Sequence, residues 1–202
     1  MMNILYNMGD TLYINITNKC QCNCVFCIRN EYDSVRGNES LWLDHEPEVQ
    51  EVIEAFKKCD LDKYEHIVFC GYGEPLLKLE KVIEVCKYIR SITNKDIRIN
   101  TNGLCDLVYN KPTAHLLEGL VDSISISLNA PSAEEYLQIS KPPYGLKSFE
   151  ALLRYAEDCK KYIKEVKFSV VDVISEEQIE RCKNLASSMG IPLRVRHKDE
   201  DQ

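Results

Sequence analysis

Short runs of β-branched and aromatic residues alternate along the chain with stretches whose apolar positions recur every three or four residues. The first pattern is typical of strands and the second of amphipathic helices. Six strands are predicted, over residues 12–17, 66–71, 97–102, 123–129, 166–173 and 192–196. Helical spacing lies between most of them, in residues 49–56, 82–89, 152–156 and 179–189.

This alternation predicts parallel β-α units in an α/β fold. Crossovers between parallel strands are almost always right-handed, so six units form either a doubly wound sheet or part of a barrel. Turn sequences follow three strands: GYGEP the second, NTNG the third and NAPS the fourth. We therefore predict one domain over residues 1–202, with its site at the carboxyl ends of the strands and a charged tail over residues 198–202.

Composition narrows the functional classes. The net charge of −7 argues against a broad nucleic-acid-binding face, so free duplex DNA is not an expected ligand. The start of the chain has no secretory signal, and no stretch approaches the ~20 apolar residues of a membrane span. We expect a cytoplasmic protein that does not bind membranes. In that reducing compartment the ten cysteines are not expected to form disulfides. Clustered cysteines indicate metal or redox chemistry there, and scattered ones indicate core packing.

Four cysteines crowd into the stretch NKCQCNCVFCIRN, at Cys20, Cys22, Cys24 and Cys27. A structural zinc site usually takes two cysteine pairs, and a second close pair is missing. Cys20, Cys24 and Cys27 alone give the spacing C-x3-C-x2-C. A 4Fe-4S cluster held by three thiolates leaves one iron open to an outside ligand. Cys22 is either an alternative ligand or a bystander, and we expect a bystander.

The remaining cysteines are isolated along the chain. Three lie on the apolar faces of predicted helices and one lies in an apolar strand, so we expect these to fill the core. They are Cys59, Cys86, Cys182 and, in the strand, Cys70.

The loop CQCNCVFC resembles the cysteine motif of the radical S-adenosylmethionine (radical SAM) superfamily. GYGEP is similar to that family's Gly-Gly-Glu-Pro motif, NTNG to its Thr-Asn-Gly, and SISLNA to its ribose-contacting segment on strand four. The four features occur in the family's order, over residues 10–196. The opening NILYNMGDTLYINITNKC, together with CIRN, also resembles a subgroup associated with TatD-family nucleases.

The resemblance implies a 4Fe-4S cluster on Cys20, Cys24 and Cys27. It also implies that S-adenosylmethionine chelates the open iron and is cleaved to a 5′-deoxyadenosyl radical, which abstracts a substrate hydrogen. The residues expected to contact the cofactor are Phe26, Gly73, Glu74, Ser127, Asn129 and Val173, with Val171 as a second adenine wall. Glu74 could instead cap the helix that follows it, and the valines could belong to the core.

Six strands make only a partial parallel (β/α)6 barrel, laterally open, because the usual closed form needs more strands. A radical needs a dry cavity. We therefore expect a bulky substrate or a partner protein to close the open side, and an electron donor such as flavodoxin or ferredoxin. The alternative is a non-enzymatic module that binds zinc or an iron-sulfur cluster for redox work. GYGEP and SISLNA favour the enzyme.

Overall fold

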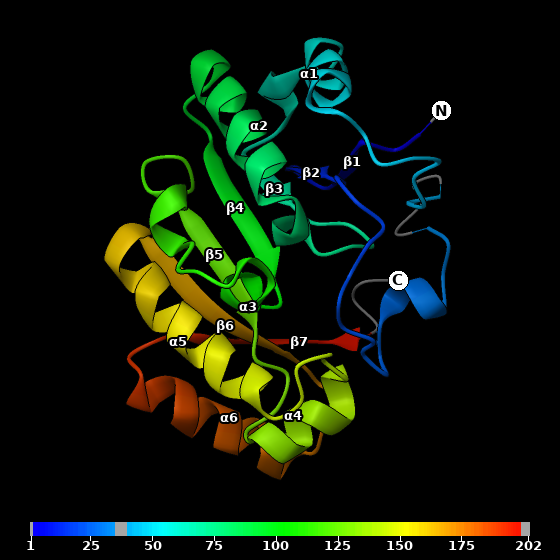
Figure 1. Ribbon diagram of the computed structural model, residues 1–202. Helices are drawn as coiled ribbons and strands as arrows, with labels where there is room; N and C mark the ends of the chain where they lie inside the picture. The colour runs from blue at the N-terminus through cyan, green and yellow to red at the C-terminus, as the bar shows by residue number, and fades with distance from the viewer. Residues whose placement is uncertain (1, 35–39, 199–202) are drawn as a thin grey trace.

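The computed structural model describes residues 2–34 and 40–198 (Figure 1). Within these residues seven strands form one sheet in the order β1-β2-β3-β4-β5-β6-β7. The strands are β1 (Leu5–Met8), β2 (Thr11–Ile14), β3 (His66–Phe69), β4 (Asp96–Thr101), β5 (Ser123–Ser127), β6 (Glu165–Val171) and β7 (Leu193–Arg196). The α-helices are α1 (Val49–Lys57), α2 (Leu79–Ile92), α3 (Cys105–Tyr109), α4 (Ala133–Ser140), α5 (Lys147–Tyr162) and α6 (Glu176–Ser188). Short 3₁₀ helices are η1 (Ile28–Asn30), η2 (Leu61–Lys63), η3 (Pro75–Lys78) and η4 (Ala114–Leu117).

The predicted fold class is confirmed. Strands β2 to β7 are parallel to one another, and β1 and β7 are the two edges of a sheet that does not close. The expected count of six strands missed β1, which pairs antiparallel with β2. A two-residue turn joins them, in which Gly9 has a φ of 59°. Tight hairpins need a residue that tolerates positive φ, so the glycine of NMGDT was the available signal.

Helices α3 and α4 were also missed. Both are short, with five and eight residues, and too brief to establish an apolar period. Helix α4 begins instead at a capping side chain, because the Ser132 hydroxyl accepts a hydrogen bond from the Glu135 N–H. The predicted helices around residues 49–56, 82–89, 152–156 and 179–189 are present as α1, α2, α5 and α6.

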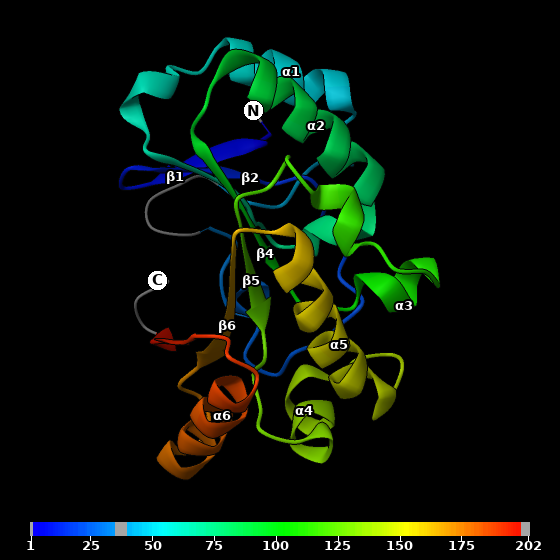
Figure 2. The ribbon, with the colours of Figure 1, turned by 90° about the vertical axis from the view of Figure 1, so that its left-hand side faces the viewer.

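The main core lies between the outer face of the sheet and the helices. Figure 2 shows α2, α3, α4 and α5 on one side of strands β4 to β6, with α6 below β6 and β7 in that view. Ile67, Ile97 and Ile124 from the strands are fully buried against Val82 and Leu152 from the helices. Burial of these branched side chains removes apolar surface from water, at about 25 cal/mol per Å².

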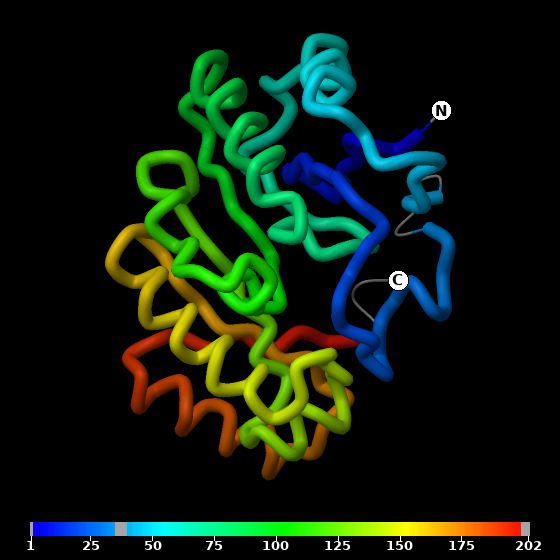
Figure 3. The backbone as a smooth tube through the Cα atoms, viewed as in Figure 1, coloured from blue at the N-terminus to red at the C-terminus, as the bar shows by residue number. Residues whose placement is uncertain are grey.

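The inner face of the sheet carries the polar residues. On β5, Ile124 and Ile126 are fully buried in the core, while Ser125 and Ser127 lie on the opposite, half-buried face. The sequence predicted this alternation. In Figure 3 the segment after β2 runs along this inner side and brings η1 beside the end of β7. The Lys198 ammonium contacts the Glu31 carboxylate there at 2.7 Å. The rest of the predicted tail, 199–202, lies outside the described residues.

Of the helices in the described parts of the chain, none combines the length and the apolar character that crossing a bilayer requires.

Candidate functional site

A cavity of about 210 Å³ lies where the cysteine loop meets the carboxyl ends of the strands. All four clustered cysteines line it, together with residues from the ends of β3, β4, β5, β6 and β7. The lining residues include Cys20, Cys22, Cys24, Phe26, Cys27, Cys70, Gly73, Glu74, Asn100, Asn102, Ser127, Asn129, Val171 and Arg196. Segments far apart in the sequence therefore converge on the thiols, as expected for loops at this end of a parallel sheet.

The cysteine loop is held by the carboxyl end of α4. The N–H of Asn23 donates to the Ser140 carbonyl at 3.2 Å, and the N–H of Val25 donates to the Ile139 carbonyl at 2.9 Å. The Cys24 thiol also lies 3.7 Å from the Ser140 carbonyl. The last carbonyls of a helix lack partners within the helix, and here loop groups occupy them. The unpredicted helix α4 thus sets the position of the thiols.

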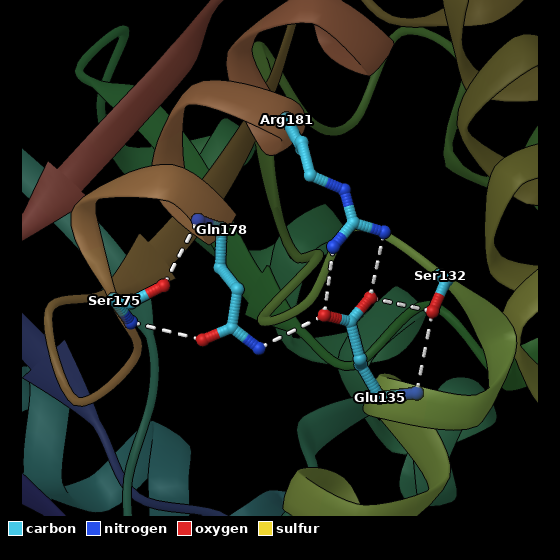
Figure 4. Close-up of polar contacts among 5 residues, drawn as sticks. All are labelled: Ser132, Glu135, Ser175, Gln178 and Arg181. Atoms are coloured by element: carbon cyan, nitrogen blue, oxygen red, sulfur yellow. Dashed lines mark hydrogen bonds and ion pairs between the residues drawn. The ribbon is translucent and has the colours of Figure 1, made fainter.

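Helix α4 is anchored at its other end to α6 (Figure 4). Both carboxylate oxygens of Glu135 lie 3.0 Å from the Arg181 guanidinium, and the Gln178 amide donates to Glu135 at 2.9 Å. Ser175 and Gln178 form a capping box at the start of α6. The arginine and the hydrogen bonds, of which that from Ser132 is the strongest, lower the pKa of Glu135. A fixed α6 therefore supports α4, which supports the cysteine loop.

Glu74 is buried beneath the cavity, with 4% of its surface exposed. Its carboxylate accepts hydrogen bonds from the Leu76 N–H at 3.0 Å, the Thr101 hydroxyl at 2.7 Å and the Asn102 N–H at 2.7 Å. Burial raises its pKa to about 7. The capping role is present, and the carboxylate also joins the ends of β3 and β4. A carboxylate has about four acceptor positions. One acceptor position of the Glu74 carboxylate therefore remains for the cofactor's ammonium, and this contact stays a prediction.

Gly73 lines the cavity, but its lack of a side chain serves the cysteine loop. A Cβ at this position would lie 2.2 Å from the Thr17 carbonyl oxygen and 2.6 Å from that of Lys19. The adjacent Glu74 N–H donates to the same Lys19 carbonyl at 2.8 Å. The sequence-based reason for glycine was close approach to the cofactor. The structure adds a second reason, close approach to the backbone that leads into Cys20, and the approach to the cofactor stays a prediction.

Asn102 connects β4 to the cysteine loop. Its side-chain oxygen accepts a hydrogen bond from the Gln21 amide at 3.1 Å, and its amide nitrogen lies 3.9 Å from the Cys20 sulfur. Asn102 is not among the residues expected from the sequence to contact the cofactor. The NTNG motif was the signal that could have placed it, since asparagine before glycine is common where a strand turns into a loop.

The remaining predicted cofactor residues divide into two groups. Phe26, Ser127 and Asn129 line the cavity, as does Val171. Asn129 has a φ of 59° and is fixed by a hydrogen bond from its amide to the Ser140 hydroxyl at 3.1 Å. Val173 is not part of the lining. Strand β6 ends at Val171, so Val173 lies in the following turn with 38% of its surface exposed.

Cys22 differs from the other clustered cysteines. Only 4% of its surface is exposed, and it packs into the main core. A hydrogen bond between the Cys20 and Cys22 side chains lowers the pKa of Cys20 and raises that of Cys22. The pair therefore favours a thiolate at Cys20 and a proton on Cys22. Burial raises the pKa of Cys24 to about 12 and also raises the pKa of Cys27.

The isolated cysteines show one exception to the expected core role. Cys86 and Cys182 are fully buried, and Cys59 packs at the edge of the core. Cys70 instead lines the cavity, half-buried. Strand β3 ends at Phe69, whose side chain faces the core, and the alternation places the next residue on the inner face.

The sulfur arrangement bears on the choice between zinc and a cluster. Four zinc ligands surround one ion, at about 2.3 Å for sulfur. Within the described residues, no three Cys, His, Asp or Glu side chains converge on one such point. A 4Fe-4S cluster presents a separate iron to each thiolate, so it does not need this convergence. Cys20, Cys24 and Cys27 line one cavity and so present the three thiols that the motif implies for a cluster.

A family model for the radical SAM superfamily matches residues 14–190. The GTP 3′,8-cyclase of Lactiplantibacillus plantarum is 29% identical over 175 residues, covering 84% of this chain and 49% of that protein. A probable dual-specificity RNA methyltransferase RlmN of Natranaerobius thermophilus is 30% identical over 135 residues, covering 64% of this chain and 36% of that protein. The chain thus spans about half the length, or less, of these curated relatives.

Solved structures share the fold. Streptococcus suis SuiB bound to its precursor peptide SuiA has a TM-score of 0.71 at 14% identity, covering 97% of this chain and 41% of that one. The protein anSMEcpe with bound AdoMet and the Cp18Cys peptide has a TM-score of 0.64 at 24% identity, covering 93% of this chain and 50% of that one. At these low sequence identities, the similarity shows a shared fold and nothing more.

Members of the matching family use a 4Fe-4S cluster and S-adenosylmethionine, which confirms the expected cofactors at the level of the family. The cavity fits them, because it presents the three motif thiols beside the ends of the strands. Sequence motifs, fold and family model agree that this chain belongs to the radical SAM superfamily.

Proposed function

We propose that this protein cleaves S-adenosylmethionine reductively and uses the resulting radical to take hydrogen from a substrate. One observation carries the proposal: the motif cysteines and the ends of the parallel strands line one cavity. When bound, the cluster and S-adenosylmethionine supply the electron transfer and the 5′-deoxyadenosyl radical. Membership of the family supports the enzyme over the non-enzymatic zinc or iron-sulfur module.

The chain's own residues would position these groups. Cys20, Cys24 and Cys27 would hold three irons, while α4 and Asn102 fix the loop that carries them. Ser127 lines the cavity and its hydroxyl forms no hydrogen bond with another described residue, so this hydroxyl is available to a cofactor. Phe26 and Val171 would exclude water beside it.

Anaerobic reconstitution with iron and sulfide, followed by measurement of 5′-deoxyadenosine, tests this function. We expect a brown, oxygen-sensitive protein that forms 5′-deoxyadenosine and methionine from S-adenosylmethionine and a strong reductant. The Cys24→Ala variant should form neither, whereas Cys59→Ala, which changes a cysteine outside the cavity, should match the wild type. A colourless zinc protein, or a brown protein that leaves S-adenosylmethionine intact, would refute the proposal.

Several narrower proposals accompany this one. A bulky substrate or a partner protein closes the lateral side, which is supported by the unpaired edges β1 and β7. Flavodoxin or ferredoxin supplies the electron, neither a membrane nor free duplex DNA is a partner, and the protein works in the cytoplasm.

Its opening sequence supports membership of the TatD-associated subgroup. Binding of a purified TatD-family nuclease, measured by pull-down against an unrelated nuclease, tests that last point.

A further inference from the structure

A second cavity, of about 570 Å³, lies at the amino-terminal ends of β6 and β7. Small-molecule sites occupy about 300–1,000 Å³, so its size suits a ligand. Four basic residues line it, against one acidic residue, Glu165. The basic residues are Lys160, Lys164, Lys167 and Arg194. The chain as a whole has a net charge of −7, so this concentration of positive charge runs against the composition.

The side chains of three of these basic residues form no ion pair within the described parts of the chain. Lys160 contacts the Glu157 carboxylate and the Met189 carbonyl. By contrast, the side chains of Lys164, Lys167 and Arg194 form no hydrogen bond or ion pair with another described residue. Neighbouring cationic groups repel one another, and an anion placed among them relieves that repulsion.

The acidic groups around the cavity offset only part of this positive charge. Glu165 lies on the same sheet face but is exposed and forms no ion pair with another described residue. Asp172, at the far end of β6, is paired with His197 at 2.7 Å. Glu31, across the cysteine loop, is paired with Lys198 at 2.7 Å.

Protection of a sheet edge is the simpler explanation for arginines on β7, because charges on an edge strand discourage pairing with other chains. Among the three unpaired basic side chains, this explanation applies to Arg194 alone. Lys164 lies in the loop between α5 and β6, and Lys167 is on β6, which pairs on both sides. Arg98, whose Nε is buried without a partner, lies on the inner face of the central strand β4. Protection of the sheet edge therefore does not account for Lys164, Lys167 or Arg98.

The cationic cavity and the cysteine cavity share no lining residue, but β6 and β7 run from one to the other. Arg194 and Arg196 lie two residues apart on one face of β7, and Arg196 lines the cysteine cavity. Residues i and i+2 of a strand are about 6.6 Å apart. On β6, Lys167 lines the cationic cavity and Val171, two such steps further along, lines the cysteine cavity. A ligand extended along these strands would have its anionic end among the cations and its other end toward the cysteine cavity.

We propose that the cavity formed by Lys164, Lys167 and Arg194 binds the phosphate groups of a phosphorylated substrate. A single carboxylate would be satisfied by one arginine, whereas several unpaired cations suit a chain of phosphates. That the phosphates belong to the substrate rests on the proposed function. The binding of phosphate in the cavity does not.

Binding of inorganic tripolyphosphate to the reconstituted protein, measured by calorimetry, tests the proposal. We expect saturable binding that weakens as salt is raised. The double variant Lys167→Gln/Arg194→Gln should bind at least tenfold more weakly. Its matched control is Arg154→Gln/Lys183→Gln, which removes the same charge from two exposed, acid-paired positions on α5 and α6. The control should bind as the wild type does.

Equal weakening in both double variants, or no binding to the wild type at millimolar tripolyphosphate, would overturn the proposal. Citrate serves as the carboxylate probe, and tighter binding of citrate than of tripolyphosphate would also overturn it. Thermal unfolding of each variant identifies loss of fold, in which case Lys164→Gln, at an exposed loop position, replaces the double variant. A wild type that forms no 5′-deoxyadenosine, yet binds tripolyphosphate through these residues, would refute the proposed function and leave this inference standing.

Discussion

The two halves of the inner face of the sheet differ in how many of their polar and aromatic side chains have partners within the protein. Near β1 to β3 the rings of Tyr6 and Tyr13 stack at 5.0 Å, and every acceptor position of Glu74 but one is taken. Near β6 and β7, the side chains of Lys167 and Arg194 form no hydrogen bond or ion pair with another described residue. The first half is held in shape by the protein itself. The second would obtain its counter-charges from the proposed phosphate ligand.

The largest effect is expected from loss of a motif cysteine, which tests the half of the inner face that the protein itself holds in shape. Cys20→Ala, Cys24→Ala and Cys27→Ala should each lose nearly all bound iron after anaerobic reconstitution, because each removes a proposed thiolate. Cys22→Ala should keep its iron, since that thiol faces the core. Iron and sulfide analysis measures the effect. Iron retained in Cys20→Ala but lost in Cys22→Ala would reverse the ligand assignment.

A side chain at position 73 should displace the backbone that leads into the cysteine loop. In Gly73→Val the new Cβ would lie 2.2 Å from the Thr17 carbonyl. We expect a loss of about 3 kcal/mol in the free energy of unfolding, together with reduced iron. Gly119→Ala is the control, because nothing lies within 4 Å of its Cβ and only its positive φ costs energy, about 1 kcal/mol. Urea unfolding before reconstitution measures both. Full stability and iron, with only S-adenosylmethionine affinity reduced, would restore the original explanation for this glycine.

Removal of the Glu74 carboxylate should have a smaller effect. Glu74→Ala leaves the N–H groups of Leu76 and Asn102 without acceptors, which costs about 2 kcal/mol in the free energy of unfolding. Glu74→Gln keeps one oxygen and should lose less. Urea unfolding of the cluster-free protein compares the two. Equal stability of all three proteins would mean that the carboxylate acts on the cofactor alone.

The smallest expected effect lies furthest from the thiols. Glu135→Ala breaks the link between α4 and α6, and because this ion pair is partly exposed we expect a loss of only about 1 kcal/mol. The cluster should form but be released sooner when the protein is warmed under argon, with Lys183→Ala on the outer side of α6 as control. A cluster as durable as in the wild type would show that α4 holds the cysteine loop without help from α6.

Much of this arrangement could be predicted from the sequence. The strand and helix periods predicted the parallel units, and the motifs placed the cysteines, Glu74 and Ser127 at one end of the sheet. Helix α4 could not be predicted in the same way, since its role arises from backbone groups at Ile139 and Ser140 that have no sequence pattern. The constraint on Gly73 likewise depends on a contact with Thr17, which only the folded chain brings near.

The hydrogen bond between Cys24 and Ser140 joins groups 116 positions apart. Ribosomes add about 5–20 residues per second, so α4 leaves the ribosome roughly ten seconds after the cysteines do. During that interval the thiols have no helix to order them and are open to oxidation. Cluster insertion should therefore follow release of the α4 segment, and slowing translation between residues 28 and 140 should lower the yield of iron-loaded protein in aerated cells.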